Sequence, residues 1–180
     1  MPGQHKKVNT DVIKAQDASG NRTQMYNLMD ELIAAYHSEL AMANIVLAWN
    51  VAMKPDRDGN IPLGKVRKAS ELDRKLHGFD VVVEINKEHW DDPATTINNR
   101  RAILDRLLCE ARPVLDEDNV PKEDEDGKIV YYCRKAPIQE YPEVIERHGI
   151  YHPKLRTLAE LLKRKLEEEE RPPAANPQTP

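Results

Sequence analysis

Residues 79–111, FDVVVEINKEHWDDPATTINNRRAILDRLLCEA, join a strand pattern to a long helical pattern and decide the fold. The β-branched run at 79–86 predicts a buried strand. Asp92 followed by Pro93 is typical of a helix start, because proline fits the first helical position. The helix is therefore predicted over 94–111. Its apolar residues recur every three or four positions and are expected to be buried: Ile97, Ile103, Leu104, Leu107, Leu108 and Ala111.

The residues that precede this stretch predict two more helices and two more strands. Apolar residues at helical spacing cover 22–42, and an apolar run rich in β-branched residues covers 44–53. A strand at 63–68 follows a turn rich in Asp, Gly and Asn, and is expected to pair back on the previous strand. Ser70 is a candidate N-cap for a short helix that ends near Gly78.

The residues that follow it begin with a charged loop at 116–127 and a strand at 128–134. A helix is predicted from about 141 to 148, closed by Gly149, and a last leucine-bearing helix starts at Pro153. This order predicts an α+β fold, with a small sheet packed against the central helix and further helices towards both ends.

The composition predicts one domain over 21–170, with disordered polar tails at 1–20 and 171–180. The net charge of −4 does not call for a nucleic-acid partner. Cys109 and Cys133 form no regular cysteine framework, which favours a reducing compartment. No apolar run approaches the roughly 20 residues of a membrane span. A cytoplasmic protein is expected, in the host cytoplasm if a phage encodes it.

Single residues give little evidence for a catalytic site. Among the histidines, only 148 and 152 are four apart, and Gly149 and Pro153 flank a helix break between them. Packing or surface roles are therefore expected for the six histidines, which are His5, His37, His77, His89, His148 and His152. Cys109 is expected to be a buried, inert thiol.

Two charged segments have simple interpretations. The acidic loop at 116–127 lacks the spaced ligands and closing glutamate of an EF-hand, so a solvated loop is favoured over a calcium site. The basic residues between Lys65 and Lys75 have no interleaved aromatic residues, which favours a solvated surface over a nucleic-acid site.

The strand and helix together resemble the putative phage metallopeptidase family, which is distantly related to SprT-like and other small zincins. In that family a strand like 79–85 is followed by a Trp, here Trp90, and then by a helix of the form A-L-x-D-H-E-L-C-H. Residues 102–110 read AILDRLLCE, which keeps the Asp-x-x-Leu-Cys frame. The resemblance covers roughly residues 25–165. Segments 36–37, 63–68 and 145–150 are also similar to family segments.

The departures from the family motif affect its metal chemistry. The resemblance implies two zinc-binding histidines, a glutamate base between them and a third ligand downstream. The corresponding positions hold Arg106, Glu110, Leu107 and Ala136. Arginine stays protonated and leucine takes no proton, so no catalytic residue, no metal ligand and no cofactor is expected. The purified protein is expected to carry well under one zinc per chain.

Two structural expectations follow from these substitutions. Arg106 and Glu110 are four apart and are predicted to form an ion pair in place of the metal. Pro137 and Pro142 each remove an amide donor, so a helix is predicted to begin near Tyr141 or Pro142 and not at Pro137.

The first functional hypothesis is therefore an inactive metallopeptidase-like protein of a phage or mobile element that binds or inhibits a host macromolecule, with a host protein as the expected partner. A second is an active metal-dependent peptidase with a relocated site that uses Glu110 and a histidine such as His148. A third, binding of nucleic acid through residues 65–75, is disfavoured by the acidic net charge.

Overall fold

The computed structural model describes residues 9–57, 59–136, 138, 142–150 and 153–170, in two compact units that span residues 1–135 and 136–180. The strands are β1 (Thr10–Val12), β2 (Ile45–Asn50), β3 (Gly64–Lys68), β4 (Val81–Asn86), β5 (Ala111–Pro113) and β6 (Tyr131–Cys133). The helices of the first unit are α1 (Gln24–Tyr36), the 3-10 turn η1 (Ser38–Leu40), α2 (Glu71–His77), α3 (Lys87–Asp91) and α4 (Ile97–Leu108). The second unit holds α5 (Pro142–His148) and α6 (Pro153–Glu169).

The main sheet has the strand order β1-β2-β4-β3, and β5 and β6 form a separate pair. β2 and β4 run parallel in the centre, and β3 pairs antiparallel with β4. The predicted pairing of residues 63–68 with 44–53 is therefore wrong. β2 and β4 are buried on both faces, as is usual for central strands. β3 carries the charged residues Lys65 and Arg67, which are typical of an edge strand.

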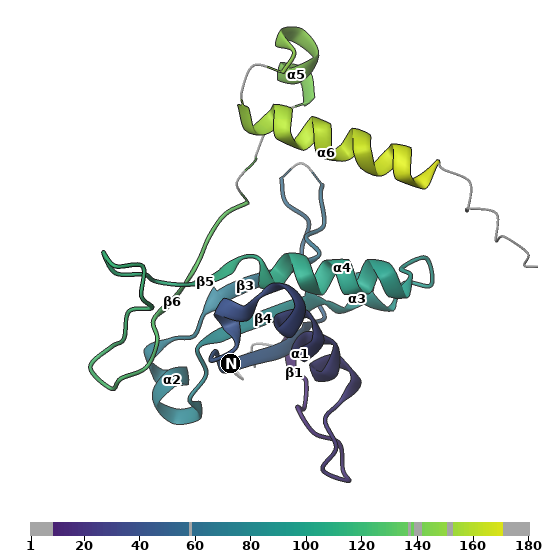
Figure 1. Cartoon of the computed structure of the whole chain (residues 1–180). Helices are drawn as coiled ribbons and strands as arrows, with labels where there is room; N and C mark the ends of the chain where they lie inside the picture. The colour runs from purple at the N-terminus through teal and green to yellow at the C-terminus, as the bar shows by residue number, and fades with distance from the viewer. Residues whose placement is uncertain (1–8, 58, 137, 139–141, 151–152, 171–180) are drawn as a thin grey trace, which may run out of the picture. The chain divides into compact units, whose positions relative to one another are not determined.

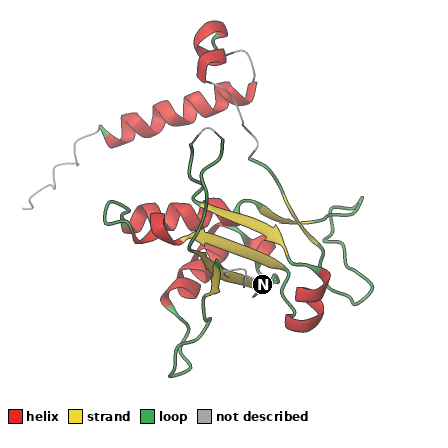
Figure 2. Cartoon of the chain, turned by 180° about the vertical axis from the view of Figure 1, so that it is seen from behind, coloured by secondary structure: helices red, strands yellow, loops and turns green. Residues whose placement is uncertain are grey.

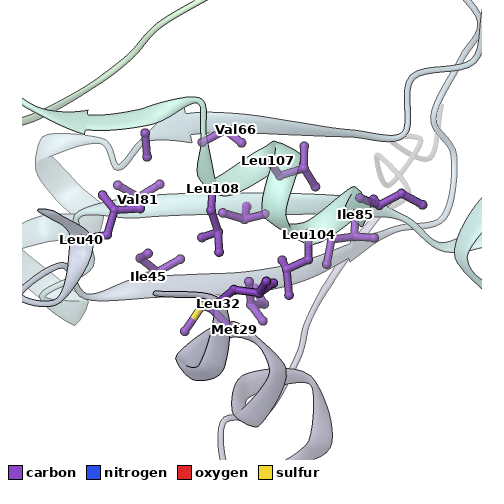
Figure 3. Close-up of a cluster of buried hydrophobic side chains, with 14 of the residues drawn as sticks. Met29, Leu32, Leu40, Ile45, Val66, Val81, Ile85, Leu104, Leu107 and Leu108 are labelled. Carbon is purple, nitrogen blue, oxygen red and sulfur yellow. The ribbon is translucent and has the colours of Figure 1, made fainter. Parts of the chain in front are cut away.

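Helices α1 and α4 cover one face of the main sheet. They lie in front of the strands in Figure 1, and the strands lie in front of them in the reverse view of Figure 2. The core between these layers is made by apolar side chains from both helices and the strands, among them Met29, Leu32, Ile45, Val66, Ile85, Leu104, Leu107 and Leu108 (Figure 3). The predicted α+β fold, with a small sheet packed against the central helix, is confirmed.

The central helix begins later than predicted. Thr96 is its N-cap, and its hydroxyl accepts a hydrogen bond from the Asn99 amide at 3.2 Å. Asp92 instead accepts from the Ala94 amide in a turn that follows the short helix α3, which the sequence did not predict. Ile97 consequently occupies the first helical turn and is 82% exposed, so its predicted burial is wrong.

Other boundaries also differ from the prediction. Residues 10–12 form β1, because their backbone pairs with residues 48–50, so they do not belong to a disordered tail. α4 ends at Leu108, earlier than predicted, and residues 111–113 form β5. The short helix α2 follows the prediction closely: Ser70 and Asp73 form a reciprocal capping box, and Gly78 ends the helix at a φ of 70°.

The second unit contains the two predicted C-terminal helices. α5 begins at Pro142, and Ile138 is not helical, so no continuous helix runs from 137 to 148. Gly149 has a φ of 69° and donates its amide to the Ile145 carbonyl, which confirms it as a C-cap. The alternative start at Tyr141 lies outside the described residues. None of the described helices is long and apolar enough to cross a membrane.

Candidate functional site

Two of the motif positions carry an ion pair. Arg106 lies in the last turn of α4, and its Nη1 atom is 3.1 Å from Oε1 of Glu110, two residues beyond the helix. The predicted ion pair is confirmed. The Arg106 side chain is 54% exposed and that of Glu110 is 27% exposed, so water still reaches both charges. The Arg106 guanidinium and the Glu110 carboxylate therefore balance each other's charge.

Leu107, at the position of the expected base, belongs to the core. Its side chain is completely buried and faces β3 at Gly64. A Cβ atom at Gly64 would lie 2.6 Å from Leu107 Cδ1 and 2.6 Å from the Glu84 carbonyl oxygen, so only glycine permits this approach of helix and strand. The position therefore supplies packing and offers no atom that accepts a proton.

Arg134, the residue after β6, is hydrogen-bonded to the chain at the end of α4. The Arg134 amide donates to the Glu110 carbonyl at 2.8 Å, and its Nε donates to the Cys109 carbonyl at 2.7 Å. Partial burial raises the pKa of the Cys133 thiol, and the Glu110 carboxylate raises it further. Ala136, at the position where the resemblance implies a third ligand, is exposed and is the first residue of the second unit. Its methyl group offers no metal ligand.

A second cluster of polar side chains lies at the start of η1, beside α4. His37 caps the end of α1 and is only 2% exposed. Its Nε2 is 2.6 Å from Oδ1 of Asp105, and the Cys109 sulfur completes a group whose ligand atoms all lie within 4.8 Å of one another. The other ring nitrogen, Nδ1, has no hydrogen-bond partner and lies 3.8 Å from the Glu39 carboxylate, which pairs with Arg112.

The sequence did not predict this cluster. It assigned His37 a packing or surface role and Cys109 an inert one. The sequence held a partial signal for it. Asp105 and Cys109 are four residues apart on the predicted helix, so both lie on the same helical face. What brings His37 to them is the packing of α1 on α4, which spans 68 positions of sequence.

The remaining candidates have structural partners. Arg67 pairs with Asp73, and Arg74 pairs with Asp80 and Asp124, so much of the basic segment at 65–75 is neutralised. In the acidic loop, Asp124 and its counterpart Asp116 accept backbone amides of their own turns, which favours turn formation over calcium binding. His77 stacks on Phe79, and His5 and His152 lie outside the described residues.

The comparison with protein families gives one match. The profile of the putative phage metallopeptidase family matches residues 19–164, which is most of the chain and extends into both units. The chain belongs to this family. The resemblance to this family is thereby confirmed, and the interpretation of the metal motif stays a prediction. The comparisons with curated proteins and with solved structures found no match.

Proposed function

We propose that this member of the phage metallopeptidase family is catalytically inactive and binds a host macromolecule, namely a protein. The burial of Leu107 carries the proposal. A peptidase of the motif's type needs a carboxylate at this position to take a proton from metal-bound water. Leu107 is completely buried against Gly64, so no neighbouring carboxylate could take over that position without displacing the core.

The ion pair supports the same proposal. A catalytic zinc needs three protein ligands and an open position for water. At the motif positions only Glu110 has ligand atoms, and one of its oxygens is paired with the Arg106 guanidinium. A cation at this place would be repelled by Arg106 and would compete with it for the carboxylate. The proposal is that these positions hold no metal.

The exposed apolar side chains support a binding role. Leu72 and Leu76 lie one turn apart on α2 and are both more than half exposed. Neighbouring exposed apolar side chains offer a candidate contact surface for a protein partner. The paired arginines of this region, Arg67 and Arg74, favour a protein over a nucleic acid as the partner.

The catalytic half of the proposal is tested by incubating the zinc-supplemented protein with a fluorescently labelled, denatured protein substrate. We expect no cleavage above the buffer rate. Cleavage that a chelator abolishes, and that falls in Glu110→Gln, would contradict the proposal and support the active peptidase with a relocated site. Glu110→Gln keeps the side-chain volume and removes the only carboxylate at the motif positions.

The binding half is tested by affinity capture from host lysate followed by mass spectrometry. We expect a specific host protein to be retained by the full chain and lost with Leu72→Glu/Leu76→Glu. The control is Val120→Glu, which alters an exposed apolar residue outside α2. Retention of the same protein by the double variant would place the surface elsewhere, and the absence of any specific protein would oppose a binding role.

A further inference from the structure

We propose that His37, Asp105 and Cys109 form a binding site for one Zn²⁺ ion, separate from the motif positions. The observation behind it is the convergence of imidazole, carboxylate and thiol groups within 4.8 Å, from the end of α1 and one face of α4. Three protein ligands would leave the fourth tetrahedral position of the zinc to a water molecule. This mixture of soft and borderline ligands selects zinc over Mg²⁺ or Ca²⁺, which prefer oxygen.

The distances allow an ion to enter with small movements. Zinc sits about 2.0–2.3 Å from its nitrogen, oxygen and sulfur ligands, so ligand atoms in a tetrahedral site are about 3.3–3.8 Å apart. The present 2.6 Å contact between His37 and Asp105 must open, and the sulfur of Cys109 must close in. The Asp105 side chain is 38% exposed, so its carboxylate is in contact with solvent as well as with His37.

The second ring nitrogen of His37 is placed to make an outer-sphere contact if an ion binds the first. Nδ1 is buried without a hydrogen-bond partner, although a buried polar atom in this position is costly. In a neutral ring that donates from Nε2 to Asp105, Nδ1 carries a lone pair towards the Glu39 carboxylate 3.8 Å away. With zinc on Nε2, the proton moves to Nδ1 and faces that carboxylate, which is the outer-sphere arrangement typical of histidine ligands.

A nucleophilic role for the same three residues fits less well. A thiol activated by histidine needs the sulfur on one ring nitrogen and the orienting carboxylate on the other. Here the Asp105 carboxylate holds Nε2, Nδ1 faces Glu39, and His37 is almost fully buried. The cluster is therefore assigned to metal binding and not to acyl transfer.

The site would act as a clip between two helices. His37 ends α1, whereas Asp105 and Cys109 lie on α4, so an ion would cross-link two elements that meet only in the folded state. Metal that binds the folded chain stabilises it. The proposal differs from the expectation of well under one zinc per chain, which considered only positions 106, 110 and 136 and stays a prediction.

The experiment titrates the metal-free full chain, without a metal-binding tag, with Co²⁺ as a spectroscopic substitute for zinc. We expect one Co²⁺ per chain, a thiolate-to-cobalt charge-transfer band, and displacement of the cobalt by Zn²⁺. Cys109→Ser should abolish the band, whereas Cys133→Ser should keep it. Glu110→Gln should also keep it, because the motif positions are not ligands. Glu39→Gln should weaken binding by about tenfold or more.

The result that overturns the site is the absence of a band at saturating cobalt, or a band that survives Cys109→Ser or disappears in Cys133→Ser. If Cys109→Ser does not fold, as judged by circular dichroism, Asp105→Asn replaces it and should reduce the affinity. Peptidase turnover is measured separately. Metal binding without turnover supports both proposals, and turnover that is lost in Cys109→Ser would overturn the inactive function while keeping the site.

Discussion

At the scale of single residues, Arg106 and Glu110 form an ion pair at the end of α4. The basic residue precedes the acidic one, which is the weaker order relative to the helix dipole. Both side chains also keep contact with water. The pair therefore neutralises two charges beside the core without adding much to stability.

We predict that a double-mutant cycle with Arg106→Ala and Glu110→Ala gives a coupling free energy of about 0.2–0.5 kcal/mol in urea denaturation. The physical reason is that solvent screens a half-exposed pair. The control cycle uses Glu71 and Lys75, which have the same spacing with the acid first and lie 2.8 Å apart. A coupling above about 1 kcal/mol at Arg106 and Glu110 would show that the pair is desolvated, which contradicts the exposure seen here.

At the scale of elements, four hairpin turns in the described part of the chain share one hydrogen-bond pattern. Each turn begins with an aspartate whose carboxylate accepts a hydrogen bond from the backbone amide four residues later. The residue three positions after each aspartate has a positive φ. The turns begin at Asp17, Asp56, Asp116 and Asp124. This is the type I turn with a following left-handed residue that often closes hairpins.

The electrostatics of the aspartates agree with this geometry. The Asn21 amide, and then that of Ser19, hold the pKa of Asp17 below its usual value. The Lys128 amide does the same for the pKa of Asp124. Three of the turns place glycine at the left-handed position, and the turn at Asp116 places Asn119 there, with a φ of 62°. Asparagine tolerates this conformation better than other residues with a side chain.

We predict that Gly127→Ala destabilises the first unit by about 1–2 kcal/mol, because alanine pays the steric cost of the left-handed conformation. Gly127→Asn should cost clearly less, since Asn119 already occupies the equivalent place. Urea denaturation of the two variants provides the comparison. Equal losses would mean that side-chain size at this position matters more than backbone conformation.

At the scale of the whole molecule, the hydrophobic core lies entirely within the first unit. Its buried residues run from Tyr26 to Tyr131, and all of them precede residue 136. In the described part of the second unit, Leu155 is buried, whereas Leu161, Leu162 and Leu166 of α6 are largely exposed. The predicted single domain over 21–170 remains a prediction, and the two compact units suggest a direct test of it.

We predict that a chain of residues 1–135 folds on its own, because it retains both helices and all strands that enclose the core. Its urea unfolding should be cooperative, with a midpoint close to that of the full chain, and its circular dichroism should lose mainly the helical signal of α5 and α6. Loss of cooperative unfolding would show that residues 136–170 complete the domain, as the sequence alone predicted.

The sequence by itself determined the features whose hydrogen bonds close within a few residues. The capping box at Ser70, the C-cap at Gly149 and the strand at 81–86 follow from local backbone preferences and side-chain spacing. The residues Arg106 and Leu107 are likewise read directly from the sequence, whereas their correspondence to a metal motif stays a prediction.

Only the tertiary structure decided which distant segments meet. β3 pairs with β4 because the two most apolar strands occupy the centre of the sheet, and this competition is not written in the strand at 64–68 itself. The meeting of His37 with Asp105 depends on how α1 packs on α4. Such contacts result from burying apolar surface between whole elements, and that free energy is a property of the assembled core and not of any local stretch.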